Sequence, residues 1–455
     1  MLRVEDTDQS RLVEGSVENL LLVLASVWLI PDEGPNNPWD KGPYFQSERL
    51  DIYDKYVSEL IEKDKAYHCF CSSERLSELR SEQQSLGLPT KYDQNCRFLS
   101  ENEVKEKLAS KCPHTVRLKV PKNKKVSFED MIRGKIEVDT KDVDDQVLMK
   151  SDGFPTYHMA VIVDDHLMGV THVIRWEEWV PSTPKHVLIY EAFGWEQPVF
   201  AHLPLLLGKS KKKLSKREGD VSVESFLEKG FLPEATLNYI SLLWWNPKTT
   251  EEIFSMDELI QRFELTDVHK SGAVFDVERL EWFNSKYIVN YDIDTLYNKL
   301  MTHLGRYDVE FKEFLLTQDE WYTKKVLSEL KTRLKTLSEF KGLTGFFFTA
   351  PITTSTDLLM NPKMKIDSIE IVQKGLELSL QVLKQQKSDF ESIDQIKEIF
   401  ISAIKEAEMK NGQVLWPVRV ALSMEQFSPG ALELLYVLGK DKSIERIEKV
   451  LKDIS

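Results

Sequence analysis

The sequence predicts an α/β protein, with a doubly wound sheet in its first half and helices alone in its last third. Residues 151–207 alternate strand-like and helical segments, as repeated strand–helix–strand units do. Nearly everything after residue 222 reads helical, with long amphipathic segments at 325–341, 366–386 and 391–408. A chain of 455 residues is too long for one simple core, so we expect several domains.

The elements follow in chain order from apolar spacing and turn residues. A strand end opens the chain, a helix begins near Ser16, and a loop rich in Pro, Gly and Asn precedes a second helix. The remaining expected elements are a charged helix at 72–86, strands in "HTVRLKV" and "KIEVDT", a strand, turn and strand in "TYHMAVIVDDHLMGVTHVIR", and a helix in "STPKHVLIYEAFGW".

Composition excludes several classes of protein. Apolar residues make up 42% and charged residues 29%, which is typical of a globular chain, and no apolar run is long enough to span a membrane. The opening "MLRVEDTDQSR" is unlike a signal peptide, and four cysteines indicate a reducing compartment. The net charge of −14 argues against nucleic acid, but the basic stretches 119–125 and 209–217 leave a local phosphate-binding face open.

The basic stretch "KLSKR", residues 213–217, is a candidate phosphate site. Lys213 and Lys216 can place ammonium groups on phosphate oxygens, with Ser215 assisting. Such cations stabilise the charge that develops on a pyrophosphate leaving group. Taken alone, the stretch is better explained as a solvated surface loop.

Three stretches together resemble the class I glutamyl-tRNA synthetases: "RVEDTD" at the start, "SDGFPTYHMAVIVDDHLMGVTHVIRWEEW", and "KLSKR". "GPYFQSERLDIYDKY", "HKSGAVFDVERLEWFN" and "WPVRVALS" extend the resemblance over the whole chain in the right order. It implies an incomplete Rossmann-type class I synthetase catalytic domain with an α+β acceptor-binding insertion, followed by all-α stem-contact and anticodon-binding domains. The implied limits are 1–55 and 151–220 for the catalytic domain, 56–150 for the insertion, 221–320 for the stem-contact domain and 321–455 for the anticodon-binding domain.

The resemblance assigns roles to residues whose chemistry suits them. A guanidinium is the natural partner of the substrate's side-chain carboxylate, and Arg175 matches that position. The implied glutamate-binding residues are Glu5 for the amino group, the aromatic Tyr157 and Trp179, Arg175, and Asp164 and Glu178 for local polarity. The implied ATP-binding residues are Leu205, Leu206, Lys213, Ser215, Lys216 and Arg217, with Lys216 and Lys213 as the catalytic cations. Without the resemblance, we would interpret Arg175 as a surface ion-pair partner, Tyr157 and Trp179 as core residues, and Glu5 as a helix-capping residue.

The implied reaction joins glutamate to tRNA in two steps. The α-carboxylate of glutamate attacks the α-phosphate of ATP, held with Mg²⁺, and the terminal adenosine of glutamate tRNA then accepts the glutamyl group. We expect a monomer without membrane contact, in a bacterial cytoplasm or, alternatively, a mitochondrial matrix or plastid. Charging of glutamine tRNA as well, or a catalytically dead tRNA-binding relic, remain alternatives. The helical last third argues against a glutaminyl-tRNA synthetase, whose anticodon end is two β-barrels, and against short relatives that lack an anticodon domain.

Three cysteines are candidate zinc ligands. Cys69, Cys71 and Cys96 resemble the zinc-binding version of the family's insertion, and three thiolates suit a structural zinc. Tyr92 is the candidate fourth ligand, with His68 as a second choice. Three reduced cysteines in a metal-free insertion remain the alternative.

The chain departs from the family pattern in two ways. The family's "H-[IL]-G-H" or "H-x-G-G" signature, expected before "RVEDTD", is not in the sequence, so we expect a truncated record and a poor catalyst as written. Tryptophan also stands at four positions where the family pattern leads us to expect glycine: Trp28, Trp39, Trp176 and Trp244. One codon read as glycine in the source organism would explain all four, and Met424 is a further, unexplained departure.

Overall fold

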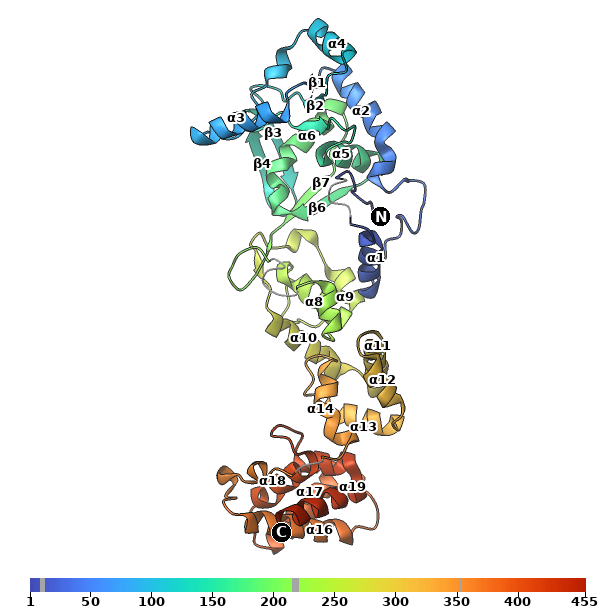
Figure 1. Ribbon diagram of the computed structural model, residues 1–455, viewed down its shortest axis with the longest axis vertical. Coiled ribbons are helices and arrows are strands. Elements are labelled where there is room, and N and C mark those ends of the chain that lie inside the picture. The colour runs from blue at the N-terminus through green and yellow to red at the C-terminus, as the bar shows by residue number, and fades with distance from the viewer. Residues whose placement is uncertain (9–12, 215–220, 352–353) are drawn as a thin grey trace. The chain divides into compact units, whose positions relative to one another are not determined.

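The computed structural model describes residues 1–8, 13–214, 221–351 and 354–455. The chain divides into two compact units (Figure 1). Unit 1 comprises Met1–Glu218 and Leu237–Asp276, and unit 2 comprises Gly219–Thr236 and Val277–Ser455. The expected ATP-side residues Ser215, Lys216 and Arg217 lie outside the described residues.

A four-stranded mixed sheet lies at the centre of unit 1. Its strand order is β4 (Gly134–Asp139), β3 (Lys125–Asp130), β7 (Val199–Leu203) and β6 (His172–Trp176). β3 and β4 form an antiparallel pair, whereas β3, β7 and β6 run parallel. Helix α6 (Thr183–Phe193) connects β6 to β7, the strand–helix–strand unit that the alternating pattern predicts. The α/β prediction is therefore confirmed, although β3 joins this sheet from within the range expected for the insertion.

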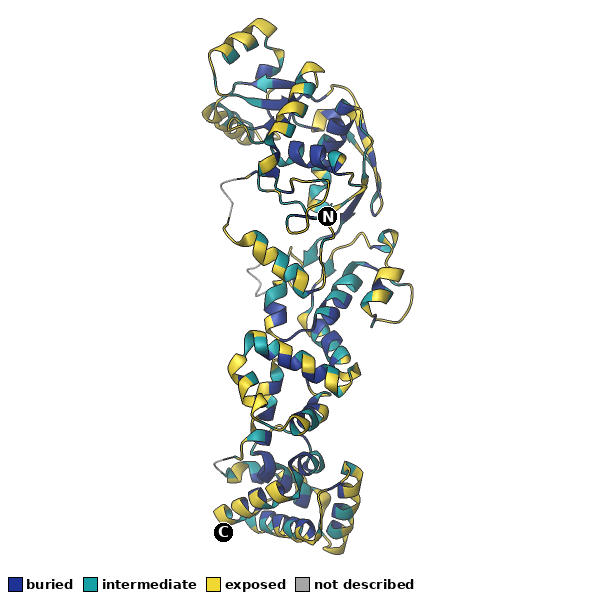
Figure 2. Ribbon diagram, turned by 90° about the vertical axis from the view of Figure 1, so that its right-hand side faces the viewer, coloured by how far each residue is buried: buried dark blue, intermediate teal, exposed yellow. Residues whose placement is uncertain are grey.

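One segment of the predicted sheet is a helix. The expected first strand of "TYHMAVIVDDHLMGV" is α5 (Tyr157–Leu167), and only the second, β6, is a strand. Seven consecutive residues of α5, from Met159 to Asp165, are buried. A helix buried on all sides lacks the polar stripe that reveals a 3.6-residue period, so its apolar run looks like a buried strand. α5 packs on α6 and on α2 (Leu50–Glu62), and these helices share one core with residues of β2 (Thr115–Leu118), β3, β5 (Val147–Met149) and β7. Buried residues are drawn in dark blue in Figure 2.

Smaller elements complete unit 1 and confirm the other predicted strands and helices. An antiparallel sheet joins β1 (Ala66–Cys69), β2 and β5, and a parallel pair joins β8 (Leu206–Leu207) to β9 (Ala273–Val274). The further helices are α1 (Ser16–Ser26), α3 (Ser73–Ser85), α4 (Glu101–Ala109), α8 (Pro233–Trp244) and α9 (Met256–Arg262). The 3₁₀ helices of this unit are η2 (Gln46–Arg49), η3 (Asn95–Phe98), η4 (Thr140–Asp142), η5 (Glu177–Ser182) and η7 (Leu265–Asp267).

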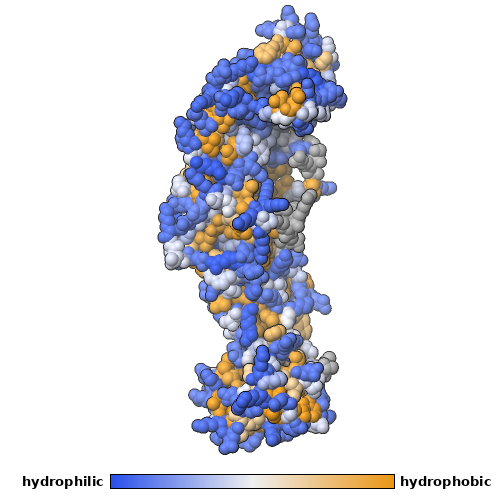
Figure 3. All heavy atoms as spheres, turned by 90° about the vertical axis from the view of Figure 1, so that its left-hand side faces the viewer, coloured by the Kyte–Doolittle hydropathy of each residue, from blue (hydrophilic) through white to orange (hydrophobic). Residues whose placement is uncertain are grey.

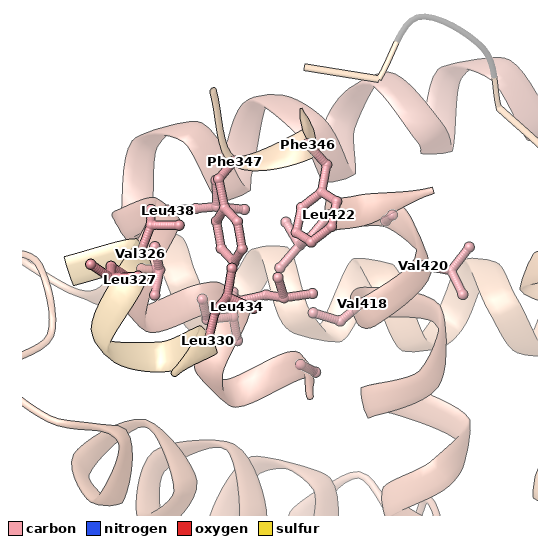
Figure 4. Close-up of a cluster of buried hydrophobic side chains, with 14 of the residues drawn as sticks. Val326, Leu327, Leu330, Phe346, Phe347, Val418, Val420, Leu422, Leu434 and Leu438 are labelled. Carbon is pink, nitrogen blue, oxygen red and sulfur yellow. The ribbon is translucent and has the colours of Figure 1, made fainter. Parts of the chain in front are cut away.

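Unit 2 is helical in the part of the chain that the structure describes. Side chains from α13, α14, α18 and α19 meet in its core, where Val326, Phe347, Val418 and Leu434 are fully buried (Figure 4). Its helices are α7 (Val223–Glu228), α10 (Val277–Asn290), α11 (Ile293–Tyr307), α12 (Val309–Leu316), α13 (Glu320–Leu330), α14 (Glu339–Phe348), α15 (Thr356–Leu359), η8 (Pro362–Met364), α16 (Ile369–Gln385), α17 (Ile393–Glu406), α18 (Asn411–Ser423) and α19 (Ala431–Ile454).

The helix predicted at 325–341 is interrupted. α13 ends at Leu330 and α14 begins at Glu339. The segment between them turns onto Gly230, whose carbonyl oxygen accepts a 3.0 Å hydrogen bond from the backbone N–H of Leu337. A Cβ atom at Gly230 would lie 2.7 Å from that nitrogen, so the close approach depends on a glycine distant in sequence. The amphipathic segments at 366–386 and 391–408 are confirmed as α16 and α17.

No helix among the described residues is both long and apolar enough to cross a membrane. One face of the molecule carries hydrophilic side chains over most of its area, with hydrophobic side chains in separate patches (Figure 3).

The backbone at Trp28 has a conformation that glycine favours. Trp28 has φ +60°, and it follows α1 in the place where a Schellman motif has its left-handed residue. The N–H of Trp28 bonds to the carbonyl of Ala25, and that of Leu29 bonds to the carbonyl of Leu24, as the motif requires. Met424 likewise ends α18 with φ +53°.

The other three tryptophans have no left-handed backbone. Trp176 follows Arg175 in β6, and adjacent residues of a strand point to opposite faces of the sheet. The ring of Trp176 lies 5.5 Å from that of Trp244, and Trp39 is exposed. The side chains of Trp176 and Arg175 therefore point away from each other, although the two residues are neighbours in sequence.

Candidate active site

Strand β6 and the 3₁₀ helix η5 present the two central side chains of the candidate site, Arg175 and Trp179. The half-buried guanidinium of Arg175 donates three hydrogen bonds into unit 1. Nε donates to Nε2 of His202 at 3.0 Å, Nη1 to Nδ1 of His186 at 3.1 Å, and Nη2 to Oγ1 of Thr183 at 2.8 Å. We call these four residues, with Tyr157 and Trp179, the Arg175 cluster.

Two aromatic rings border the guanidinium. Tyr157, in the first turn of α5, has its ring centroid 4.6 Å from that of Trp179, and the guanidinium carbon lies 5.8 Å from the centroid of Trp179. Burial raises the pKa of Tyr157, the negative charge of Glu5 raises it further, and the positive charge of Arg175 opposes both. The structure therefore brings together Tyr157, Arg175 and Trp179, three of the predicted glutamate-binding residues, and the charge of Glu5 acts on Tyr157.

Asp164 lies in the interior rather than at an accessible surface. Its side chain is fully buried and accepts hydrogen bonds from Gln46 at 2.9 Å, Arg49 at 2.8 Å and Tyr53 at 2.8 Å. These contacts tie η2 and α2 to α5. The hydrogen bonds of Asp164 therefore stabilise the fold. Its predicted direct effect on the polarity of the glutamate site stays a prediction.

A second buried carboxylate supports the segment that carries Glu5. Asp165 pairs with Arg3 at 2.9 Å, and Arg3 in turn pairs with the more exposed Glu5 at 3.1 Å. Burial raises the pKa of Asp165 to about 6, although the positive charge of Arg3 opposes this shift. Sequence reasoning included "RVEDTD" but gave Arg3 no role, and its ion pairs link Glu5 to Asp165 of α5.

The described members of the expected ATP-side set, Leu205, Leu206 and Lys213, lie on the two arms of a turn in which Leu207 pairs with Lys213. Leu206 belongs to β8, and Leu214 N–H donates to its carbonyl oxygen at 2.8 Å. The backbone N–H of Leu205 donates to Oε1 of Glu177, and Nζ of Lys213 lies 2.6 Å from Oε2 of Glu178. Lys213 and Glu178 are both largely exposed, so their pairing leaves either one accessible to another partner.

Four polar side chains behind Arg175 were not predicted. His202 and Asp130 form a buried pair with 2.5 Å between Nδ1 and Oδ2, and His186 and His158 form a second pair with 2.9 Å between Nε2 and Nδ1. They come from β3, α5, α6 and β7, which are distant in sequence. Only the three-dimensional structure assembles them, so no local pattern could have found them.

The charge of Arg175 is not neutralised within the described residues. None of the carboxylates there lies within 4.0 Å of its guanidinium nitrogens. Arg49 and Arg97 of unit 1 each have such a partner, whereas the buried Arg117 donates to the backbone carbonyl of Asp145 instead. Arg175 uses three of its five N–H donors on His202, His186 and Thr183, and the hydroxyl of Tyr157 also interacts with its guanidinium. A half-buried cation without a counter-ion, beside a pair of aromatic rings, is suited to bind a carboxylate.

The cysteine cluster also forms as predicted. The sulfurs of Cys69, Cys71 and Cys96 lie within 4.8 Å of one another, and those of Cys71 and Cys96 are 3.6 Å apart. Oη of Tyr92 lies 3.3 Å from the sulfur of Cys69 and 3.4 Å from that of Cys71. Tetrahedral zinc with bonds of about 2.3 Å requires sulfurs about 3.8 Å apart, so these residues fit the metal. His68 does not join them, and its ring contacts that of His114 instead.

Comparison with known proteins places the whole chain in one family. Residues 1–282 match the model of the catalytic domain of the class I tRNA synthetases (E and Q), and residues 295–451 match an anticodon binding domain. The chain is 42% identical over 450 residues to a glutamate–tRNA ligase of Clostridium botulinum, covering 99% of the chain and 90% of the relative. It is 42% identical over 462 residues to that of Clostridioides difficile, covering 100% and 92%.

Solved structures agree. A glutamate tRNA ligase from Elizabethkingia meningosepticum, solved in complex with its amino acid, superimposes with a TM-score of 0.88 at 35% identity. That comparison covers 100% of this chain and 92% of the other. Glutamate-tRNA synthetase from Elizabethkingia anophelis gives a TM-score of 0.84 at 35% identity, covering 99% and 92%.

Proposed function

Because the chain belongs to the glutamate–tRNA ligases of the class I tRNA synthetase family, we propose that the Arg175 cluster binds the side-chain carboxylate of L-glutamate. The observation that carries this proposal is the guanidinium of Arg175, half-buried and without a carboxylate partner in the described part of the chain. Membership of the family implies ATP with Mg²⁺, L-glutamate and tRNA as the substrates.

The second N–H groups of Nη1 and Nη2 of Arg175 match the two oxygens of a carboxylate. A bidentate pair of this kind is stronger than a neutral hydrogen bond and favours glutamate over glutamine, whose amide N–H₂ would face a donor. Glu5 is the candidate partner of the substrate's ammonium group, since opposite charges at the two ends would orient the amino acid. Tyr157 and Trp179 restrict water around the charged pair, which strengthens the interaction.

Activation and transfer then depend on position and charge rather than on a protein nucleophile. The α-carboxylate must reach the α-phosphate of ATP, and Lys213 and Lys216 are the cations proposed to stabilise the departing pyrophosphate. Lys216, with Ser215 and Arg217, lies outside the described residues. Leu205 and Leu206, across the turn from Lys213, remain proposed ATP contacts. Mg²⁺, when bound with ATP, supplies further neutralisation of phosphate charge.

We further propose that Cys69, Cys71, Cys96 and Tyr92 hold one structural zinc. Two N–H donors face the sulfurs, from Arg75 to Cys71 and from the backbone of Phe70 to Cys96, each at 3.3 Å. Such donors stabilise thiolates, the form that binds zinc. Metal-free thiols remain the alternative.

The remaining partner assignments rest on the family. We propose a monomer that charges glutamate tRNA in a bacterial cytoplasm, with a mitochondrial matrix or plastid as the alternative. Charging of glutamine tRNA as well would be decided by contacts of the anticodon-binding region, and a tRNA-binding relic would bind tRNA without using glutamate.

The test is the affinity of wild type, Arg175→Gln and Arg175→Lys for L-glutamate, measured by calorimetry with L-glutamine as the competitor ligand. Loss of one partner of a largely buried charged pair costs about 2–5 kcal/mol, so Arg175→Gln should weaken glutamate binding by at least about 30-fold. Arg175→Lys should bind glutamate with intermediate affinity, since lysine keeps the positive charge but cannot form two parallel hydrogen bonds to one carboxylate. The matched control Arg262→Gln, at an exposed arginine of unit 1, should change nothing. Unchanged glutamate binding by Arg175→Gln would refute the assignment.

A further inference from the structure

We propose that Asp130 and His202 are positioning residues for Arg175, which fix the direction of its guanidinium through the tautomer of the His202 imidazole. This inference rests on the proposed function, in which Arg175 binds the substrate carboxylate. Neither residue would touch the substrate, since the side chains of both are fully buried behind Arg175.

The arginine dictates which nitrogen of His202 carries the proton. A guanidinium has only donors, so Nε2 of His202, 3.0 Å from Nε of Arg175, must accept and is unprotonated. The neutral ring then carries its proton on Nδ1, which lies 2.5 Å from Oδ2 of Asp130. A proton on Nε2 would place two N–H groups against each other, so only one tautomer is compatible with this geometry.

Asp130 is itself held in place by the backbone. Its Oδ1 accepts hydrogen bonds from the N–H groups of Ile132 at 3.0 Å and Arg133 at 2.9 Å, in the turn after β3. Burial opposes ionisation of Asp130, but the hydrogen bond from His202 and those from the backbone outweigh it and lower its pKa. A fixed, ionised acceptor thus orients His202, and His202 orients the Nε edge of Arg175.

A second pair of residues, His186 and His158, holds the Nη1 edge of Arg175 in the same way. Nδ1 of His186 accepts from Arg175, so its proton is on Nε2 and is donated to Nδ1 of His158. Burial and the charge of Arg175 lower the pKa of His186 well below its ordinary value. Burial, Lys185 and Arg175 lower that of His158 to about 4. Both rings are therefore neutral at neutral pH: His186 accepts from Arg175, and His158 accepts from His186.

The arrangement orients Arg175 without neutralising it. His202, His186 and Thr183 accept from three edges of the guanidinium plane, and the negative charge of Asp130 reaches it only through an imidazole. A carboxylate in direct contact would fix the side chain equally well, but it would compete with the substrate for the same N–H groups. The relay itself occupies neither of the two remaining N–H groups of Arg175, so a ligand carboxylate can accept from them.

The decisive variant is Asp130→Asn, which keeps the size of the side chain. The amide can donate to Nδ1 of His202 and so permits the tautomer whose Nε2–H opposes Arg175. We expect the preference for L-glutamate over L-glutamine, measured as the ratio of the two dissociation constants, to fall about tenfold or more. His202→Gln, whose side-chain oxygen can still accept from Arg175, should keep most of this preference, whereas His202→Leu should lose it.

The matched control is Asp145→Asn, at another fully buried carboxylate of unit 1, where Arg97 is the partner. It should destabilise unit 1 without changing the glutamate-to-glutamine ratio. If Asp130→Asn leaves that ratio unchanged, or weakens both ligands equally, the positioning role is overturned. If Arg175→Gln abolishes glutamate binding while Asp130→Asn does not, only the positioning role fails. If Arg175→Gln binds glutamate normally, the proposed function itself fails.

A measurement on the wild-type chain covers the case in which Asp130→Asn does not fold. Nitrogen chemical shifts of ¹⁵N-labelled histidines report which ring nitrogen is protonated. We expect His202, identified by comparison with His202→Gln, to be neutral with its proton on Nδ1 at pH 7. The opposite tautomer, or a doubly protonated ring, would overturn the proposal.

Discussion

Replacing Asp164 with asparagine should destabilise unit 1 rather than act on glutamate directly. Asp164 is fully buried, and its carboxylate accepts hydrogen bonds from Gln46, Arg49 and Tyr53. The guanidinium of Arg49 is itself only 3% exposed, so the substitution leaves a buried cation without its counter-ion.

The lost ion pair sets the cost. Breaking a buried ion pair by removing one partner costs about 3–5 kcal/mol. Asparagine keeps one oxygen as an acceptor, so only part of the hydrogen bonding to Asp164 is lost as well. Since each 1.36 kcal/mol is a factor of ten, the segments that Asp164 joins should open roughly 150- to 5000-fold more often.

Hydrogen exchange followed by mass spectrometry measures this opening locally, which matters because the chain has two units and its global unfolding need not be two-state. Amides of α2 and α5 should lose protection in Asp164→Asn, while those of α16 and α18 in unit 2 should not. The matched control is Glu178→Gln, whose exposed pair with Lys213 should contribute no more than about 1 kcal/mol. If Asp164→Asn keeps full protection and instead loses affinity for glutamate, Asp164 acts in the site and the structural interpretation is wrong.

Three further predictions concern Trp28, His158 and the cysteine cluster. Trp28→Gly should stabilise unit 1 by up to about 1 kcal/mol in thermal melts, because glycine relieves the left-handed backbone at this position. The control Trp39→Gly should give no such gain. A Trp28→Gly variant less stable than wild type would contradict the idea that the backbone at Trp28 is strained. The folded-state pKa of His158 is depressed from 6.5 to about 4, so its contribution to stability is fully present above pH 6.5 and is lost as the pH falls toward 4. Between pH 7.5 and 5 wild type should therefore lose about 2 kcal/mol more than His158→Gln, and equal losses would show that His158 is accessible to protons in the fold. By elemental analysis, the purified chain should carry one zinc ion and Cys96→Ser should carry less. The backbone amides of β1 should also be less protected from hydrogen exchange in Cys96→Ser. A metal-free wild type would refute the zinc site.

Elements with a clear period could be predicted from the sequence, and elements without one could not. α1, α3, α16 and α17 have amphipathic or charged helical patterns, and their predicted limits agree with the structure to within a few residues. α5 is buried on all sides and so carries no stripe. The break between α13 and α14 depends on contact with Gly230, about a hundred residues away, which no local pattern contains.

The residues of the candidate site likewise fall into those that sequence motifs identify and those that only the structure identifies. Motif resemblance selected Glu5, Tyr157, Arg175 and Trp179, and the structure places the last three near one another, with the charge of Glu5 acting on Tyr157. Of the residues that hold Arg175 from behind, Asp130 is one of several polar residues in β3 and His202 is a single polar residue in the apolar β7, so sequence alone gives neither a distinctive spacing. Asp164 shows that a motif can also select a residue whose hydrogen bonds lie within the fold, because a carboxylate within a motif can support the fold rather than contact the ligand.

A crystal structure of the chain with L-glutamate is the most direct test of the central claim that Arg175 binds the substrate side chain. The account predicts the side-chain carboxylate within about 2.7–2.9 Å of both Nη1 and Nη2 of Arg175, with Nε still on His202. Glutamate bound with its side chain elsewhere, or an Arg175 that turns away from His202 to a protein carboxylate, would contradict it.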